Sequence, residues 1–269
     1  MISCPFATRL GRASLIAFSL IFNHYSAGQT PGNSAAPGGS LTAEQVVSRM
    51  EERNRERAEA LREFEGSRTY RLQYRGFPGS RDAEMQVEMN FLAPASKRFK
   101  VLSQTGSKFI IDHIFMKLLQ GEQEALAEEN RRHSALSREN YDFKLAGYEP
   151  GEKSGRYILA VTPRSKDKFL YQGRVWVDAT DFAVTHIEGE PAKNPSFWIK
   201  KTLIQHQYVK VGSFWLPSQN RSESQTRLGG RALLTIDYTN YKIISVTPGS
   251  QTNSARSEGI GPGQERATR

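Results

Sequence analysis

Histidine and cysteine are the side chains from which a metal site in this chain would be built. Four histidines follow residue 28, and none stands at zinc-motif spacing from another histidine or a carboxylate. The patterns H-E-x-x-H and C-x-x-C do not occur in the sequence. We therefore expect no metal and no cofactor. We interpret His206 as part of an exposed sheet edge, because Lys200 and Lys210 share its strand parity.

Nucleophilic catalysis would need an activated serine or cysteine. The sequence has no G-x-S-x-G elbow and no phosphate-binding glycine loop, and its single cysteine, Cys4, lies in a segment that we expect to be removed. Asp178 and Asp181 flank a turn, where aspartate is favoured for local hydrogen bonds. Asn220 begins a glycosylation sequon, which is a weak signal. We predict no catalytic residues and no enzyme. A hydrolase whose nucleophile the sequence does not reveal remains an alternative to the binding functions given below.

The N-terminal segment decides the expected compartment. Arg9 and Arg12 precede an apolar run at 13–22 that ends in small residues, the layout of a signal peptide cleaved near Gly28. Residues 29–40 are rich in Pro, Gly and Ser and are typical of a flexible tether. We predict a signal peptide at 1–28, a disordered tether at 29–40 and an exported, periplasmic protein without a lipid-modified cysteine.

The charge balance limits the partners. The chain carries a formal net charge of +9, which favours nucleic acid, an anionic membrane surface or plain solubility. An exported protein rarely meets nucleic acid, so we expect no nucleic-acid partner. We also expect the protein to be a monomer. Residues 247–269 are polar without apolar repetition, which predicts a disordered tail.

Between tether and tail, the hydrophobic period predicts one mainly β domain at 41–246. A helix is expected at 41–64, followed by two hairpin-linked strands whose apolar faces alternate with polar residues, and by a third strand through Phe99 and Val101. Residues 108–137 predict one or two inserted helices, and the first half is apolar almost all round, so it must be buried or plug a concave sheet.

Seven further strands follow the insertion. They are expected at 143–148, 157–162, 169–178, 182–190, 198–211, 214–227 and 231–244, separated by short turns that favour antiparallel neighbours. The predicted fold class is therefore mainly β (α+β): an antiparallel meander of about ten strands curled into an incomplete barrel, with an N-terminal helix and with helices inserted after the third strand on the concave side.

Such a curved sheet with an apolar helix predicts an apolar binding cavity, for which flexible methionine is well suited. The expected ligand-binding residues are Tyr70, Leu72, Tyr74, Met85, Val87, Met89, Phe91, Phe115, Leu118, Leu234 and Ile236.

Four segments resemble the outer-membrane lipoprotein-sorting proteins of the LolA/LolB-like superfamily. They are 173–178 (GRVWVD), 181–191 (DFAVTHIEGEP), 208–217 (YVKVGSFWLP) and 232–238 (ALLTIDY). The resemblance implies an incomplete antiparallel barrel around a few helices, with an apolar cavity that shields lipoprotein acyl chains. This chain departs from the family in two ways. The arginine that contacts the lid in the lipoprotein carrier matches no particular arginine here, and the N-terminal helix is unusually charged.

The prediction from the sequence is therefore a periplasmic carrier or sensor that binds lipoprotein acyl chains or other lipids. Its partners would be these lipids and an envelope membrane protein. The alternative is an envelope regulatory module that binds a protein partner with the same fold, using the basic surface and the charged helix at 41–64.

Overall fold

Ten strands form one antiparallel sheet in the residues that the computed structural model describes, 41–152, 154–194 and 196–247. The predicted signal peptide, tether and nearly all of the predicted tail lie outside these residues and stay predictions. The strands are β1 Leu61–Arg75, β2 Arg81–Leu92, β3 Ser96–Gly106, β4 Tyr141–Glu149, β5 Arg156–Pro163, β6 Tyr171–Asp178, β7 Val184–Pro191, β8 Ile199–Val211, β9 Phe214–Thr226 and β10 Arg231–Val246.

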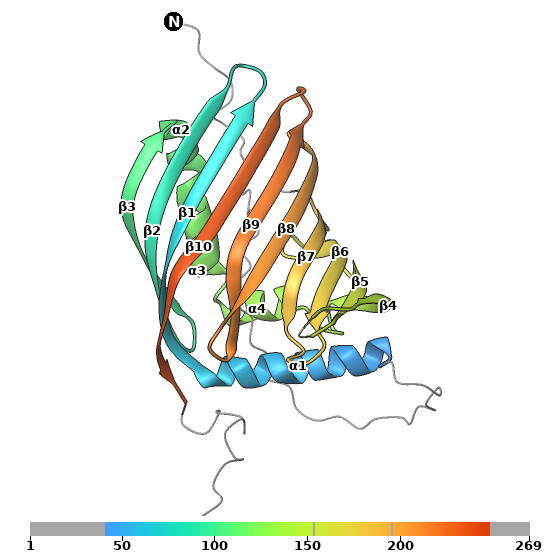
Figure 1. Cartoon of the computed structure of the whole chain (residues 1–269). Coiled ribbons are helices and arrows are strands. Elements are labelled where there is room, and N and C mark those ends of the chain that lie inside the picture. The colour runs from blue at the N-terminus through green and yellow to red at the C-terminus, as the bar shows by residue number, and fades with distance from the viewer. Residues whose placement is uncertain (1–40, 153, 195, 248–269) are drawn as a thin grey trace, which may run out of the picture.

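The order of the strands across the sheet is β3-β2-β1-β10-β9-β8-β7-β6-β5-β4. The first and last strands are neighbours inside the sheet, with Tyr70 opposite Ile236 and Arg75 opposite Arg231. The sheet curves but does not close, because β3 and β4 remain at opposite edges (Figure 1). The predicted succession of about ten antiparallel strands in an incomplete barrel is confirmed, with the opening where the chain inserts its helices.

The N-terminal helix α1, Ala43–Ala60, lies across one end of the sheet (Figure 1). Thr42 and Gln45 form a capping box at its start, which satisfies backbone N–H groups that the first turn leaves unpaired. Its other end is tied to the turn between β6 and β7, because the Arg57 guanidinium donates to the carbonyl oxygens of Asp181 and Phe182.

The predicted end of this helix at residue 64 is wrong. Leu61 is already extended, and Leu61 and Phe64 belong to β1, where they are 2% and 4% exposed. Leu61 and Phe64 are three residues apart, a spacing that places both on one face of a helix or, with a bulge, on one face of a strand. Register shifts near Leu61 and Glu63 allow β1 to pair with β10 there, and this long-range pairing outweighs the local helical pattern.

The inserted segment forms α2 Lys108–Ile110, a π-helical stretch at Ile111–Phe115, α3 Met116–Glu124 and α4 Glu128–Ser134. Its first half packs on β1, β2 and β10, and Phe115 is fully buried there. The expectation of a buried apolar half is confirmed. None of the helices in the described part of the chain is long and apolar enough to span a bilayer.

The buried side chains form three clusters. One joins Val46, Val47 and Met50 of α1 to the strands from β4 to β8. The second joins the inserted helices to β1, β2 and β10, and the third surrounds Phe64 and Leu216 near the end of α1. The two sets of helices thus cover different parts of the sheet.

Candidate functional site

The structure brings together most of the residues expected to bind a ligand. Eight of them lie in the cluster beneath the inserted helices, and Tyr74 packs against it from the side. Met89 and Phe91 lie in the third cluster, with Phe64 and Leu216. The eight are Tyr70, Leu72, Met85, Val87, Phe115, Leu118, Leu234 and Ile236.

These side chains are packed against one another. Tyr70, Met85, Val87 and Phe115 are each 0% exposed, and the Tyr70 and Phe115 rings lie 5.9 Å apart. The inserted helices therefore occupy the concave face of β1, β2 and β10 in this structure. A ligand can reach these residues only where the helices give way, so their role in binding stays a prediction.

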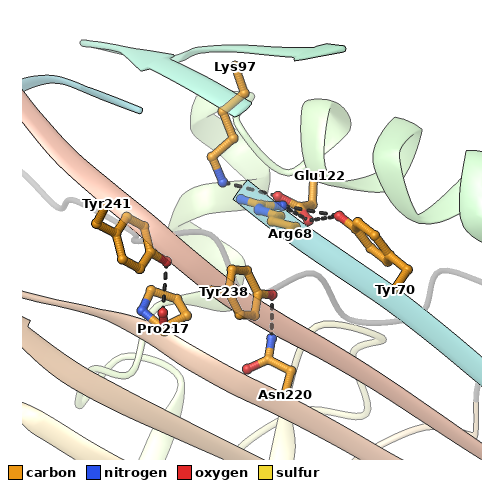
Figure 2. Close-up of polar contacts among 8 residues, drawn as sticks. All are labelled: Arg68, Tyr70, Lys97, Glu122, Pro217, Asn220, Tyr238 and Tyr241. Carbon is orange, nitrogen blue, oxygen red and sulfur yellow. Dashed lines mark hydrogen bonds and ion pairs between the residues drawn. The ribbon is translucent and has the colours of Figure 1, made fainter. Parts of the chain in front are cut away.

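One polar cluster crosses this apolar interface. The Glu122 carboxylate of α3 accepts from Arg68 Nη1 of β1 at 2.5 Å and from Lys97 Nζ of β3 at 3.3 Å. The Tyr70 hydroxyl lies 3.4 Å from the same carboxylate. Figure 2 shows Glu122 reaching from the helix to the two cations on the sheet. We call Arg68, Lys97 and Glu122 the buried ion cluster.

Burial and charge oppose each other in this cluster. Burial alone would raise the pKa of Glu122, but Arg68 and Lys97 outweigh it and lower that pKa to about 2. Burial also lowers the pKa of Lys97 despite the neighbouring carboxylate, whereas Glu122 keeps the pKa of Arg68 raised against its desolvation. Two cations facing one carboxylate leave the cluster a formal charge of +1.

The Arg68 guanidinium is also enclosed by aromatic rings. Its carbon lies 5.3 Å from the Phe99 ring centre and 5.0 Å from that of Tyr238, within the range of cation–π attraction. Burial raises the pKa of Tyr70, so its phenol remains protonated at neutral pH and can donate to Glu122. The cluster is thus ordered on several sides and fixes one position of α3 over the sheet.

A buried polar strip runs along β8, β9 and β10 beside the apolar cluster. The Asn220 amide donates to the Tyr238 hydroxyl at 2.8 Å, and the Tyr241 hydroxyl donates to the Pro217 carbonyl at 2.8 Å (Figure 2). The Thr202 and Ser224 hydroxyls lie 2.9 Å apart. Thr202, Asn220 and Ser224 are buried, so the inward face of β8 and β9 is partly polar.

The expectation of an exposed edge at His206 is wrong. β8 lies inside the sheet between β7 and β9, and His206 is 4% exposed. Burial, with a smaller contribution from the charge of His186, lowers the pKa of His206 to about 4. The polar residues that share the strand parity of His206 therefore lie on the inward face of β8. Asn220, the first residue of the sequon, is also buried, at 7% exposed.

Sequence reasoning missed the buried ion cluster. Arg68 shares the parity of Tyr70 and Leu72, so a cation on the inward face of β1 was the available signal. Glu122 lies four residues after Leu118, on the same face of α3, but its charged neighbourhood resembles a solvated surface. No group of three or more His, Cys, Asp or Glu within the described ranges is arranged to hold a metal ion.

No known family profile matches the sequence, and no curated protein matches it. Among solved structures, the chain is similar to a LolA superfamily protein of Nitrosomonas europaea, with 10% identity over 77% of this chain and 96% of that chain, at a TM-score of 0.35. It is also similar to a putative outer membrane lipoprotein-sorting protein domain of Vibrio parahaemolyticus, with 13% identity over 77% and 94% of the two chains, at a TM-score of 0.39.

A third similar structure is the MucA/MucB complex of Pseudomonas aeruginosa, with 13% identity over 77% of this chain and 95% of that chain, at a TM-score of 0.24. With identities and TM-scores this low, no argument about family or function rests on these matches.

Proposed function

We propose that this chain binds apolar, chain-like ligands, namely lipoprotein acyl chains or other lipids, between its concave sheet and the inserted helices. The observation that carries the proposal is the interface under these helices. It consists of apolar side chains from β1, β2 and β10 on one side and from residues 110–119 on the other. The buried ion cluster links α3 to β1 and β3 across this apolar interface.

An acyl chain offers the sheet the same kind of contact that the helices now provide. Burial of a sixteen-carbon chain contributes on the order of 10 kcal/mol, at about 0.8 kcal/mol per CH₂, before the costs of ordering the ligand. The contact is non-directional, so one ligand chain can replace another. Binding should therefore depend on chain length more than on head group.

The inserted segment has features that suit movement. The π-helical stretch at Ile111–Phe115 interrupts regular α-helical hydrogen bonding, and such stretches often occur at functional sites. Gly121 lies within α3, next to Glu122, where glycine lowers helix stability by about 1 kcal/mol relative to alanine. We infer that α2 and α3 move away from the sheet to admit the ligand and that the buried ion cluster restores the closed position.

The experiment combines native mass spectrometry of protein purified from the envelope with uptake of a fluorescent fatty acid. The expected results are co-purified lipid and uptake of fatty acid by the delipidated protein. A triple variant replaces the buried ion cluster by apolar side chains: Arg68→Met, Lys97→Met and Glu122→Leu. It should fold and bind fatty acid. It should exchange the bound fatty acid more slowly than the wild type, because the closed interface no longer contains charges that water can rehydrate.

Glu124→Gln serves as the control, since Glu124 is exposed on the same helix. A clean apo mass without fatty-acid uptake would contradict the proposal. If that result came with a stoichiometric protein crosslinked in cells, it would support the regulatory alternative instead.

A further inference from the structure

The end of the sheet opposite α1 carries the most exposed apolar side chains of the described residues. Phe197 is 75% exposed and Phe77 is 69% exposed, and both lie in connections between strands. Leu228, in the turn between β9 and β10, is 50% exposed, and Trp198, just before β8, is 40% exposed. We call Phe77, Phe197, Trp198 and Leu228 the apolar rim.

Two of the strand connections that form the rim are joined to each other. The Arg227 backbone N–H donates to the Trp198 carbonyl at 2.9 Å, and Arg227 Nε donates to the Phe197 carbonyl at 2.7 Å. The Arg227 guanidinium also lies over the Phe197 ring, 5.0 Å from its centre. Residues 197–198 are therefore fixed to the turn between β9 and β10, which carries Leu228.

The turn between β1 and β2 lies beside that turn at the end of the sheet farthest from α1 (Figure 1). A Cβ atom on Gly76 would lie 2.4 Å from the Cα atom of Gly230, so the two turns approach as closely as glycine allows. The Tyr74 hydroxyl donates to the Phe77 carbonyl at 2.6 Å and orders the tip. The backbone of the turn that carries Phe77 is thus ordered, and Arg227 holds the Phe197 ring.

Cations surround the rim. Arg75, Lys201 and Arg231 form ion pairs with Asp82, Glu190 and Glu223. Exposed Arg81, Lys200 and Arg227 add positive charge, and within the described ranges none of these three forms an ion pair with a carboxylate. At the opposite end, β6 ends at Asp178 and the turn that follows it carries Asp181.

We propose that the apolar rim, together with Arg81, Lys200 and Arg227, docks on the surface of a bilayer that contains anionic phospholipids. Aromatic side chains on protruding turns can enter the boundary between headgroups and acyl chains, where tryptophan is favoured. Cations beside them are attracted to lipid phosphates, by about 1 kcal/mol each. A partner protein would instead need a continuous complementary face of roughly 800 Å², whereas these apolar side chains sit on separate tips with cations among them.

This docking goes beyond the proposed ligand binding and does not depend on it. It orients the sheet with α1 away from the bilayer, because α1 lies across the opposite end (Figure 1). The membrane-facing end is then the one where β1, β2 and β10 meet the start of the inserted helices.

The test is co-sedimentation of the full-length chain with phosphatidylcholine vesicles, with and without phosphatidylglycerol. Phe77→Ser with Phe197→Ser should weaken binding to the anionic vesicles by about tenfold or more, since two exposed rings lose their apolar contact. Arg81→Gln with Lys200→Gln should weaken it by a similar factor and reduce the preference for phosphatidylglycerol, which Arg227 still supports in part.

Leu203→Ser with Val209→Ser is the matched control, because these side chains of β8 are 47% and 42% exposed and lie outside the rim. All forms carry the same N-terminal segment, so its own lipid affinity cancels in the comparison. The control should bind as the wild type does, and thermal melts should confirm that all forms fold, because the altered side chains are exposed.

The proposal is overturned if the wild type does not bind anionic vesicles, or if the rim variant binds them as well as the wild type. It is also overturned if the rim variant binds vesicles normally but loses a crosslink to another protein, or loses a concentration-dependent dimer. The rim would then contact a protein partner or a second copy of the chain. Fatty-acid uptake measured on the same preparations separates the two proposals. A rim variant that loses vesicle binding should still take up free fatty acid.

Discussion

Replacing Glu122 by glutamine tests how strongly the buried ion cluster holds α3 to the sheet. The carboxylate faces Arg68 and Lys97, and its side chain is 5% exposed. Its pKa is lowered from 4.5 to about 2, which corresponds to about 3 kcal/mol of stability at neutral pH. The variant also leaves two buried cations without their anion, so Glu122→Gln should lower the free energy of unfolding by about 3 to 5 kcal/mol.

The pH dependence gives a second, independent signature. A carboxylate whose pKa is lowered on folding stabilises the protein above its unfolded pKa, and this contribution is lost as the pH falls through the folded value. In the wild type, the contribution of Glu122 is complete above pH 4.5 and disappears toward about pH 2. Glu122→Gln should lack this acid loss.

Urea unfolding followed by circular dichroism across this pH range measures both effects. Glu124→Gln on the same helix controls for charge and helix propensity and should stay within about 0.5 kcal/mol of the wild type, as surface substitutions usually do. The reasoning would be refuted by a Glu122→Gln variant as stable as the wild type at neutral pH, or by one that keeps the full acid dependence.

Two further predictions concern the packing on either side of the cluster. Burial and the nearby His186 lower the pKa of His206 from 6.5 to about 4, so about 3 kcal/mol of stability present above pH 6.5 should be lost as the pH falls through 4. NMR should show a His206 ring that stays neutral at pH 5, and a normal titration near 6.5 would contradict its burial. Phe115→Ala should cost about 3 to 5 kcal/mol in urea unfolding, because Phe115 is 0% exposed. Met116→Ala, at 42% exposed, should cost far less, and equal costs would show that the helix is not packed on the sheet.

The sequence predicts this fold where one face of an element is consistently apolar. Met85 and Val87 alternate with polar residues, and both are fully buried as the alternation indicates. The apolar insertion around Phe115 is buried as well. The pairing of β1 with β10 joins segments far apart in the chain, and local periodicity holds no information on such contacts.

The site is less predictable because its polar residues interrupt the pattern that reveals strands. The sequence predicts an exposed edge at His206 because polar residues usually face water, yet His206 is buried inside the sheet, as is Thr202 on the same strand. Glu122 is buried only because two cations from distant strands meet it. Neither partner can be chosen from the sequence before the strand order is known.

The most direct test of the central proposal is photolabelling with a fatty acid that carries a diazirine in its acyl chain, followed by peptide mapping. We predict labels on β1, β2 and the inserted helices, around Tyr70, Met85 and Phe115, with competition by unlabelled fatty acid. Labelling confined to exposed surface residues, or labelling that excess fatty acid does not reduce, would contradict the proposed site.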